Sequence, residues 1–346
     1  MRAAYYQQQG PARAVLRVGQ LPTPKPGPGE VRVRIVASGV HVGDVNRRRG
    51  GHGSTMAYPR VIPHNDGAGT IDAVGPGVDP ARLGERVWVM LAQSQHPFGT
   101  AAEYSVVPSA HAVALPDEVS WEQGAVVGSP GITGHRALLA NGSVEGKTIV
   151  VAAPLGCATR TAVAVARRRG AGVVAAARHV SEADAALDAG ADHVVVIGGE
   201  PSQPLAAERF DRIAGVGLAI YAGPDVDRIA EVDLASYAGP DVELLKAAGT
   251  LALYGRDVAT GSLLGSPFPS KQIAVRIVSN DDLPERADAE ADADAARDLT
   301  AALAAGDLRF PIAARYPLER IAEAHDAAQR TGVAGRVVVV VDDAAA

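Results

Sequence analysis

Residues 148–178 constrain the fold most, because they predict a strand, a tight turn, a helix and a second strand in close succession. Thr148 to Ala152 is a short apolar run without charges, typical of a parallel strand buried on both faces. A turn at 153–156 follows, then apolar residues at helical spacing over 161–169 and a second apolar run at 173–177. A strand that feeds a helix through a tight turn points free backbone N–H groups at an anion, usually the pyrophosphate of a dinucleotide.

The turn itself carries fewer glycines than a dinucleotide fingerprint, which places three there. Only Gly156 remains, with Cys157 and Thr159 at the second and third positions. Cys157 would crowd the pyrophosphate, and a positive φ at either residue would weaken binding. Thr159 could instead N-cap the helix and bond a phosphate, with Arg160 adding charge. The architecture predicts a cofactor turn made of Ala153, Pro154, Gly156, Cys157, Thr159 and Arg160, while its affinity stays open.

Composition excludes several classes of protein. With 346 residues, of which 47% are hydrophobic, the chain is long enough for two domains with real cores. A formal net charge of -6 argues against nucleic acid or an acidic membrane surface as a partner. The single cysteine excludes a disulfide framework and a four-cysteine zinc lobe, and no apolar run reaches the roughly 18 residues of a membrane span. We expect a cytoplasmic enzyme with a small-molecule substrate.

Two patterns of secondary structure divide the chain. The first 120 residues are rich in glycine and proline and predict a mostly β domain, with short strands at 30–36, 69–74, 86–89 and 100–107. From about residue 121 helical segments alternate with apolar strands, which predicts a doubly wound parallel sheet with helices on both faces. The later expected strands are 194–197, 218–222, 250–254 and 273–279.

The end of the chain predicts a return to the first domain. Residues 316–329 read as a helix and 336–341 as a valine-rich strand. The expected domains are therefore 1–120 with 309–346, and 121–308. The acidic, alanine-rich segment 283–298 predicts a solvated helix or loop.

A tandem repeat lies inside the second domain. Residues 211–226 (DRIAGVGLAIYAGPDV) and 227–242 (DRIAEVDLASYAGPDV) are nearly identical. Two copies are too few for a solenoid. Because the sheet has one position for the repeated strand, we expect one copy to leave the sheet as a loop or to pack at its edge. The repeat is either a tolerated surface insertion or an element that reshapes a subunit interface or covers the cleft.

Motifs along nearly the whole chain resemble the medium-chain dehydrogenase/reductase superfamily, and within it the zinc-free quinone oxidoreductase branch that includes zeta-crystallin. Those motifs are Pro28-Gly29-Glu30, Ser38-Gly39-Val40-His41 with Asp44, Pro63-His64-Asn65-Asp66-Gly67-Ala68-Gly69, Val74-Gly75, Gly84-Glu85-Arg86-Val87, Thr100-Ala101-Ala102-Glu103-Tyr104, the nucleotide turn, Gly190-Ala191-Asp192, and Tyr316-Pro317-Leu318 through Gly335-Arg336. The resemblance implies an α/β protein with a mostly β, GroES-like catalytic domain and a Rossmann domain.

The resemblance also implies a reaction and a cofactor. It implies hydride transfer from a reduced nicotinamide to a quinone, an enone or an enoyl thioester, and a homodimer built by edge strands such as 273–279. Thr133 matches a family threonine near the nicotinamide, Gly255 would let backbone approach that ring, and Arg336 matches a terminal Lys or Arg that reaches the cleft. Arg178 follows the second strand of the nucleotide unit, where a cation accommodates the 2′-phosphate of NADP. The residue therefore favours NADPH over NADH, although a solvated arginine at a strand end would look the same.

No metal is expected in the catalytic domain. Zinc-dependent relatives carry Cys, His and Glu at the positions of His41, Asn65 and Asp66, and a further Cys near Val127 or Gly128. Asn65 and the segment that follows Val127 cannot complete a site with three protein ligands. The resemblance and the residue types leave His41 as a wall or hydrogen-bonding residue of the substrate cleft.

A reduction of an enone leaves an enolate that needs a proton or a hydrogen-bond donor. Related enoyl reductases often carry a tyrosine where His52 stands, and a histidine could serve as the acid near neutral pH. Asn65 and Tyr58 are secondary donors. His52 could equally be a solvated residue of a glycine-rich loop, and the cluster Arg47-Arg48-Arg49 either attracts a phosphorylated substrate or forms a solvated helix face.

Two other functions remain open at this point. One is a biosynthetic tailoring enzyme that uses the scaffold with little or no nicotinamide cofactor. The other is a binding or regulatory protein that has lost the cofactor. The reduced glycine count of the turn and the tandem repeat motivate both alternatives.

Overall fold

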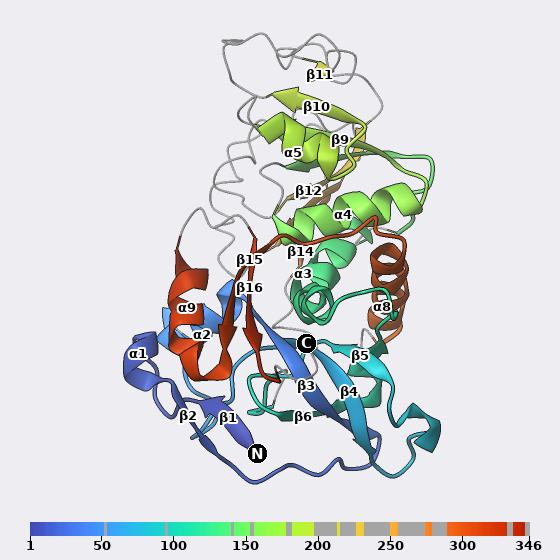
Figure 1. The fold of residues 1–346 in the computed structure, drawn as a ribbon. Coiled ribbons are helices and arrows are strands. Elements are labelled where there is room, and N and C mark those ends of the chain that lie inside the picture. Colours follow the sequence, from blue (N-terminus) through green and yellow to red (C-terminus); the bar gives the residue numbers. More distant parts are fainter. Residues whose placement is uncertain are drawn as a thin grey trace. The chain divides into compact units, whose positions relative to one another are not determined.

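The computed structural model of the protein divides into two compact units, drawn in Figure 1: unit 1 is Met1–Ser129 with Arg309–Ala346, and unit 2 is Pro130–Leu308. The structure describes residues 1–51, 54–93, 96–139, 142–152, 156–177, 182–196, 213–214, 226–231, 250–254, 274–278, 289–330 and 335–342. The sequence places a domain boundary at 120, whereas the units divide at 129, within helix α3 (Trp121–Leu139).

Unit 1 is built on a mixed sheet in the order β15-β16-β3-β4-β5-β7, with β6 paired to β3, and a separate pair β1-β2. The strands are β1 (Arg2–Tyr5), β2 (Arg17–Gln20), β3 (Glu30–Val40), β4 (Asp66–Val74), β5 (Arg86–Val89), β6 (Tyr104–Pro108), β7 (Ala112–Ala114), β15 (Ile312–Pro317) and β16 (Arg336–Val340). The helices are α1 (Ala12–Val15), α2 (Val42–Arg49) and α9 (Ile321–Gln329), with 3-10 turns η2 (Pro80–Arg82), η3 (Ser109–His111) and η7 (Leu318–Arg320).

Strand β3 connects the core of unit 1 to its candidate site. Its alternation buries Val31, Val33 and Ile35 in the apolar core, and beyond residue 35 both faces of the strand are buried. Near its end Gly39 lets α3 approach, because a Cβ there would lie 2.1 Å from the carbonyl oxygen of Ala125. The strand is longer than the expected 30–36 because tertiary packing supplies partners for residues 37–40 on β16.

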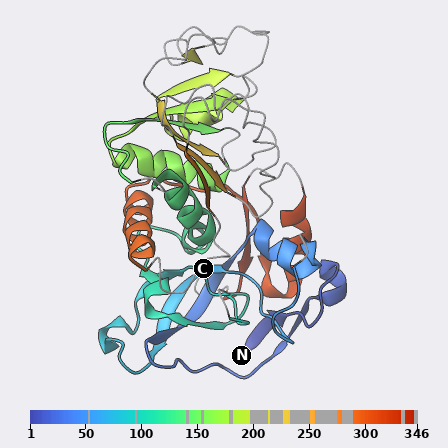
Figure 2. The same ribbon diagram turned by 180° about the vertical axis from the view of Figure 1, so that it is seen from behind.

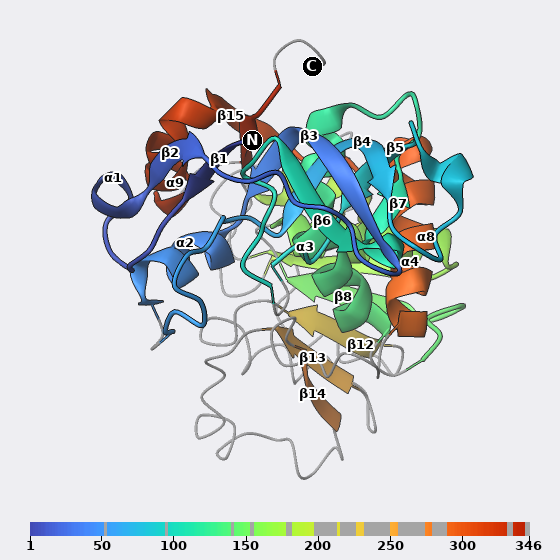
Figure 3. The same cartoon turned by 90° about the horizontal axis from the view of Figure 1, so that it is seen from below.

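Unit 2 contains a parallel sheet in the order β11-β10-β9-β8-β12-β13-β14, which confirms the expected doubly wound architecture. Its strands are β8 (Thr148–Ala152), β9 (Gly172–Ala177), β10 (His193–Val196), β11 (Ile213–Ala214), β12 (Val226–Glu231), β13 (Thr250–Tyr254) and β14 (Ala274–Val278). The helices besides α3 are α4 (Cys157–Arg168), α5 (Ala183–Asp188) and α8 (Ala289–Ala304). Figure 3 shows β8, β12, β13 and β14 in succession.

Both copies of the tandem repeat contribute a strand. β12 begins with the last residue of the first copy and continues into the second, and it pairs with β8 and β13 in the middle of the sheet. β11 comes from the first copy and pairs with β10 at the sheet edge. Both strands include the Ile-Ala of an Asp-Arg-Ile-Ala segment, at 213–214 in β11 and at 229–230 in β12. The strand expected at 218–222 lies outside the described residues.

Two expectations about helices were wrong and one was incomplete. The helix expected from residue 316 begins at Ile321, because residues 316–317 still pair with β16. The acidic segment is helical from Ala289, as expected, but two of its carboxylates, Asp294 and Asp298, bond the guanidinium of Arg169 instead of being solvated. Arg48, expected on a solvated face or beside a phosphorylated substrate, is 1% exposed. Figure 2 shows α8 from behind, beside α4.

Within the ranges given above, no helix combines the length and the apolar character that crossing a membrane requires.

Candidate functional site

The candidate site of unit 1 lies where β3 ends, α2 begins and β4 starts. His41 is the N-cap of α2: its Nδ1 accepts the backbone N–H of Gly43 at 3.0 Å, and its own N–H donates to Asp44 Oδ2 at 2.8 Å. The ring proton of neutral His41 is therefore on Nε2. Burial, reinforced by the charges of Arg336 and Arg47, lowers the pKa of His41 to about 3. At neutral pH His41 can donate a hydrogen bond from Nε2 but is not an imidazolium.

Asp66, the first residue of β4, is fully buried and held by helix α3. Both carboxylate oxygens accept the backbone N–H of Ser129 at 2.9 Å, and Oδ1 also accepts the Ser129 hydroxyl at 2.6 Å. Gly128 makes room for this contact, because a Cβ there would lie 2.8 Å from Asp66 Oδ1. Arg336 Nη2 is 4.0 Å from Oδ2. Burial raises the pKa of Asp66, although Arg336 and the Ser129 donors oppose the shift.

Asp44 is a second buried carboxyl of this site. It is 3% exposed, and its Oδ1 has no hydrogen-bond partner among the described residues. Burial raises its pKa to about 7; Arg47 and the backbone N–H of His41 lower it, and Asp66 adds to the rise. Asp44 can therefore hold or release a proton near neutral pH.

The side chains at the positions of the family's zinc ligands do not fit a zinc ion. His41 and Asp66 keep lone pairs that a metal could use, but Asn65 carries an amide in place of a usual zinc ligand, and its Oδ1 accepts the N–H of Gln93 at 2.9 Å. A ligand side chain at 128 would collide with Asp66. Catalytic zinc sites need three protein ligands with free lone pairs.

One group of potential metal ligands occurs elsewhere in the described residues. It consists of His135, Asp294 and Asp298 in unit 2. Arg169 already bridges the two carboxylates with bonds of 2.6 and 2.7 Å, and His135 Nε2 lies 3.0 Å from Asp298 Oδ2. These three residues and Arg169, the C-cap of α4, form a hydrogen-bonded and ion-paired clamp between α3, α8 and the end of α4.

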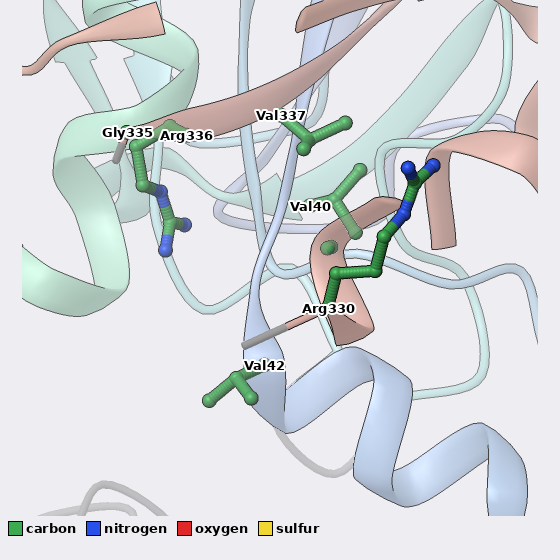
Figure 4. A pocket seen from close by; sticks show the side chains of 7 residues that line it. Val40, Val42, Arg330, Gly335, Arg336 and Val337 are labelled. Carbon is green, nitrogen blue, oxygen red and sulfur yellow. The ribbon is translucent and has the colours of Figure 1, made fainter. Parts of the chain in front are cut away.

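A pocket of about 150 Å³ lies beside this site in unit 1. It is lined by Val40, Val42, Ala328, Arg330, Gly335, Arg336 and Val337, and Figure 4 labels six of these residues. Arg336 is largely buried, yet its Nε and Nη2 lack hydrogen-bond partners among the described residues. Its described lining includes two arginines and no carboxylate, so its chemistry suits an anion.

The nucleotide turn of unit 2 leads into α4 with Gly156 as N-cap, and among the described residues no side chain caps the helix. Thr159 is the third helical residue and 5% exposed, so the expectation that it could be the N-cap was wrong. Neither Cys157 nor Thr159 has a positive φ. The close helix approach involves Gly134 of α3 instead, where a Cβ would lie 2.1 Å from the Ala158 carbonyl oxygen. The first turn of α4 contains no acidic residue, so the N-terminal end of its helix dipole suits an anion.

Several predicted residues lie elsewhere. Tyr58 is half-buried and packs against the core of unit 1, and Thr133 is buried on α3. Outside the described residues are His52, Ala153, Pro154, Arg178 and Gly255. The sequence analysis gave no role to Asp44, although it is part of a family motif, nor to Ser129 or Arg330.

Models of two protein families match the chain. The alcohol dehydrogenase GroES-like domain matches residues 27–117, and the zinc-binding dehydrogenase family matches residues 159–339, which is more than half of the chain.

Similar proteins include an alcohol dehydrogenase from Geobacillus stearothermophilus, 30% identical over 220 residues, which are 56% of this chain and 63% of that protein. The quinone oxidoreductase of Homo sapiens is 30% identical over 162 residues, 46% of this chain and 47% of that protein. The aligned segments thus span less than two thirds of either relative.

The fold is similar to that of a solved NAD-dependent alcohol dehydrogenase, with a TM-score of 0.78 and 24% identity over 99% of this chain and 100% of that one. Because two family models and the fold agree, the predicted kinship is confirmed: this chain belongs to the medium-chain dehydrogenase/reductase superfamily.

Proposed function

We propose that this protein is a zinc-free oxidoreductase that transfers hydride from NADPH to a quinone or to an α,β-unsaturated carbonyl compound. The observation that carries the proposal is the state of the zinc-ligand positions. There, the amide of Asn65 and the missing side chain of Gly128 leave His41 and Asp66 as the usual zinc ligands, fewer than the three protein ligands of a catalytic zinc site. Quinones and enones can accept hydride with only hydrogen-bond donors to stabilise the developing oxyanion.

Each unit, taken by itself, offers groups that suit a phosphate of a nicotinamide dinucleotide. In unit 2 the N-terminus of α4, whose first turn carries no acidic residue, would hold the pyrophosphate. In unit 1 the largely buried Arg336 offers guanidinium donors to a phosphate oxygen. When bound, the reduced nicotinamide supplies the hydride. The preference for NADPH rests on Arg178 in the sequence.

The residues of unit 1 supply the remaining chemistry. His41 donates from Nε2–H toward a carbonyl oxygen that becomes an oxyanion. Asp44, three residues after His41, holds a proton at its unpartnered Oδ1. It can supply this proton when the reduced product takes one up. The carboxylate of Asp66 is bonded by Ser129 and lies near Arg336, so it does not compete with the substrate for the proton donors His41 and Asp44.

We also propose a homodimer. Strand β14 is at one edge of the sheet formed by the described strands, and an uncovered edge is a suitable surface for a second copy of the chain.

Cofactor binding tests the proposal first. The purified protein is titrated with NADPH and NADH by fluorescence, and quinone and enone reduction are then assayed after dialysis against a zinc chelator. We expect micromolar affinity for NADPH, weaker affinity for NADH, and activity unchanged by the chelator. Failure of both cofactors to bind would favour a binding or regulatory protein, and NADPH binding without reduction of any acceptor would favour a tailoring enzyme.

Arg336 provides the residue-level test of the same proposal. Arg336→Ala should weaken NADPH binding about tenfold or more, since a charge-assisted hydrogen bond contributes roughly 1.5–3 kcal/mol. Arg13→Ala is the matched control, because Arg13 forms an exposed ion pair with Asp326. An Arg336→Ala protein with unchanged affinity for NADPH would exclude this role.

A further inference from the structure

Four fully buried side chains of unit 1 form a continuous chain of hydrogen bonds behind the candidate site. His325 Nε2 on α9 lies 3.0 Å from His64 Nε2, and His64 Nδ1 lies 2.8 Å from the hydroxyl oxygen of Ser38 on β3. That hydroxyl lies 2.7 Å from Thr100 Oγ1, which donates to the backbone carbonyl of Asp66 at 2.5 Å. All four side chains are 0% exposed, so water does not compete for these bonds.

The last bond fixes the direction of all the others. The only proton of the Thr100 hydroxyl goes to the Asp66 carbonyl, so Ser38 must donate to Thr100. The Ser38 hydroxyl has then used its proton and must accept one from His64 Nδ1–H. Neutral His64 therefore has a bare Nε2, which accepts Nε2–H from His325. The chain runs from His325 to the Asp66 backbone, and both rings are neutral because burial lowers the pKa of each.

The backbone conformation of His64 gives this chain of hydrogen bonds a structural role. Its φ is 79°, in the left-handed region that residues with a Cβ rarely adopt. Such a residue is held in place only when its surroundings over-determine it. Here Thr100 N–H donates to the His64 carbonyl at 3.0 Å, and both ring nitrogens are engaged in the chain of bonds. The two residues that follow His64 are Asn65 and Asp66 of the candidate site.

We propose that His325 is a positioning residue: the hydrogen-bond chain that begins at its Nε2–H holds His64 in the left-handed conformation and thereby orients Asn65 and Asp66 for the reaction. The effect on catalysis rests on the proposed function, whereas the direction of the chain does not. His325 and His64 are 261 positions apart in the sequence, so only the fold brings them into contact.

The direction is tested without cofactor or substrate. Histidine tautomers are read by 15N NMR at pH 7.5 on the full-length protein, with signals assigned through their loss in His64→Gly and His325→Gln. We expect the Nδ1–H tautomer for His64 and the Nε2–H tautomer for His325. The opposite pair of tautomers, or a charged ring, would overturn the proposal whatever the protein catalyses.

The positioning role is tested by three variants assayed for NADPH affinity, kcat and melting temperature. His325→Leu removes the donor and should lower kcat about tenfold, the equivalent of one buried hydrogen bond of roughly 1.4 kcal/mol. His325→Gln keeps an N–H donor at similar reach and should restore most of kcat. In His64→Gly/His325→Leu, glycine adopts the left-handed conformation freely, so kcat should rise above that of His325→Leu although the cavity lowers the melting temperature further.

Between His325→Leu and the double variant, a positioning role predicts that kcat rises while the melting temperature falls. If the two histidines were only structural, both quantities would fall together. His193→Leu, at an exposed position of unit 2, is the control for the substitution itself. A double variant no more active than His325→Leu would refute the role. If the wild-type protein reduces no acceptor, the proposed function fails, while the tautomer result still decides the direction of the chain.

Discussion

At the scale of single residues, burial rather than residue type sets the chemistry of the candidate site. His41 and Asp44 are neighbours in the same helix cap, yet burial moves their pKa values in opposite directions, to about 3 and about 7. In both residues the neutral form is favoured because desolvation penalises the charge. A site of neutral donors is suited to hydride chemistry that needs hydrogen bonds more than a permanent charge.

The raised pKa of Asp44 predicts a pH-dependent stability. Folding raises this pKa from 3.8, so the folded state binds more protons and stability falls as pH rises from about 4 to about 7. Asp44→Asn lacks this titrating group, so its free energy of unfolding should not show the same fall. The difference between the variant and the wild type should therefore shift in favour of the variant as pH rises from 5 to 8. Urea unfolding at several pH values measures the difference; a pH-independent difference would contradict the assignment.

His41→Asn provides a comparison of opposite sign. Folding lowers the pKa of His41 from 6.5, so the wild type loses stability as pH falls from about 6.5 toward about 3. Asparagine keeps an N-cap acceptor without titrating. Relative to wild type, this variant should gain stability on acidification, and a gain at alkaline pH instead would be inconsistent with a buried neutral histidine.

At the scale of elements, small residues decide how closely helices approach the sheet and one another. Gly128 of α3 brings the Ser129 N–H to Asp66, and Gly134 of the same helix lets α4 approach through Ala158. The glycines missing from the nucleotide turn are therefore not needed for helix packing at Thr159, which is buried in a helical conformation.

Gly128→Ala should destabilise the protein by about 1–3 kcal/mol, because the new Cβ would lie 2.8 Å from Asp66 Oδ1 and overpack a buried site. Gly172→Ala is the matched control: none of the residues that the structure describes lies within 4 Å of a Cβ there, and the substitution should be neutral or slightly stabilising. Chemical denaturation measures both. Equal losses of stability in the two variants would show that the contact with Asp66 is not the cause of the destabilisation.

The clamp on α8 predicts a second stability effect. Burial tends to raise the pKa of Asp298, but bonds from His135 and Arg169 outweigh it and lower that pKa. Asp298→Asn should cost about 1 kcal/mol at pH 7, since the group is about a quarter exposed and partly screened. Asp307→Asn, in an exposed pair with Arg168, should cost less. The ranking of the two melting temperatures checks the expectation, and it would be refuted if Asp307→Asn were the more damaging.

At the scale of the whole molecule, the tandem repeat offers two nearly identical segments for one central position of a sheet. The second copy supplies most of β12 between β8 and β13, while the first supplies β11 at the edge. Because each copy carries Asp-Arg-Ile-Ala, either one satisfies the same backbone pairing and side-chain pattern.

Deletion of residues 211–226 should therefore leave a folded protein that still binds NADPH, with the remaining copy beside β8. Deletion of 211–242 removes every source of the central strand and should abolish cooperative unfolding. Calorimetry and cofactor titration distinguish the two. Loss of folding in the shorter deletion would mean that the edge strand is required as well.

The sequence by itself determined the superfamily, the doubly wound sheet and most strand positions, because these depend on local alternation and on motifs such as Gly67-Ala68-Gly69. Only the tertiary structure decided which donors occupy Asp66, that Asp44 is a buried acid, and that His64 and His325 form a pair. Those contacts join residues that are 63 and 261 positions apart. Strand register and helix packing bring such residues together, and burial then sets their charge, so no local pattern could encode either property.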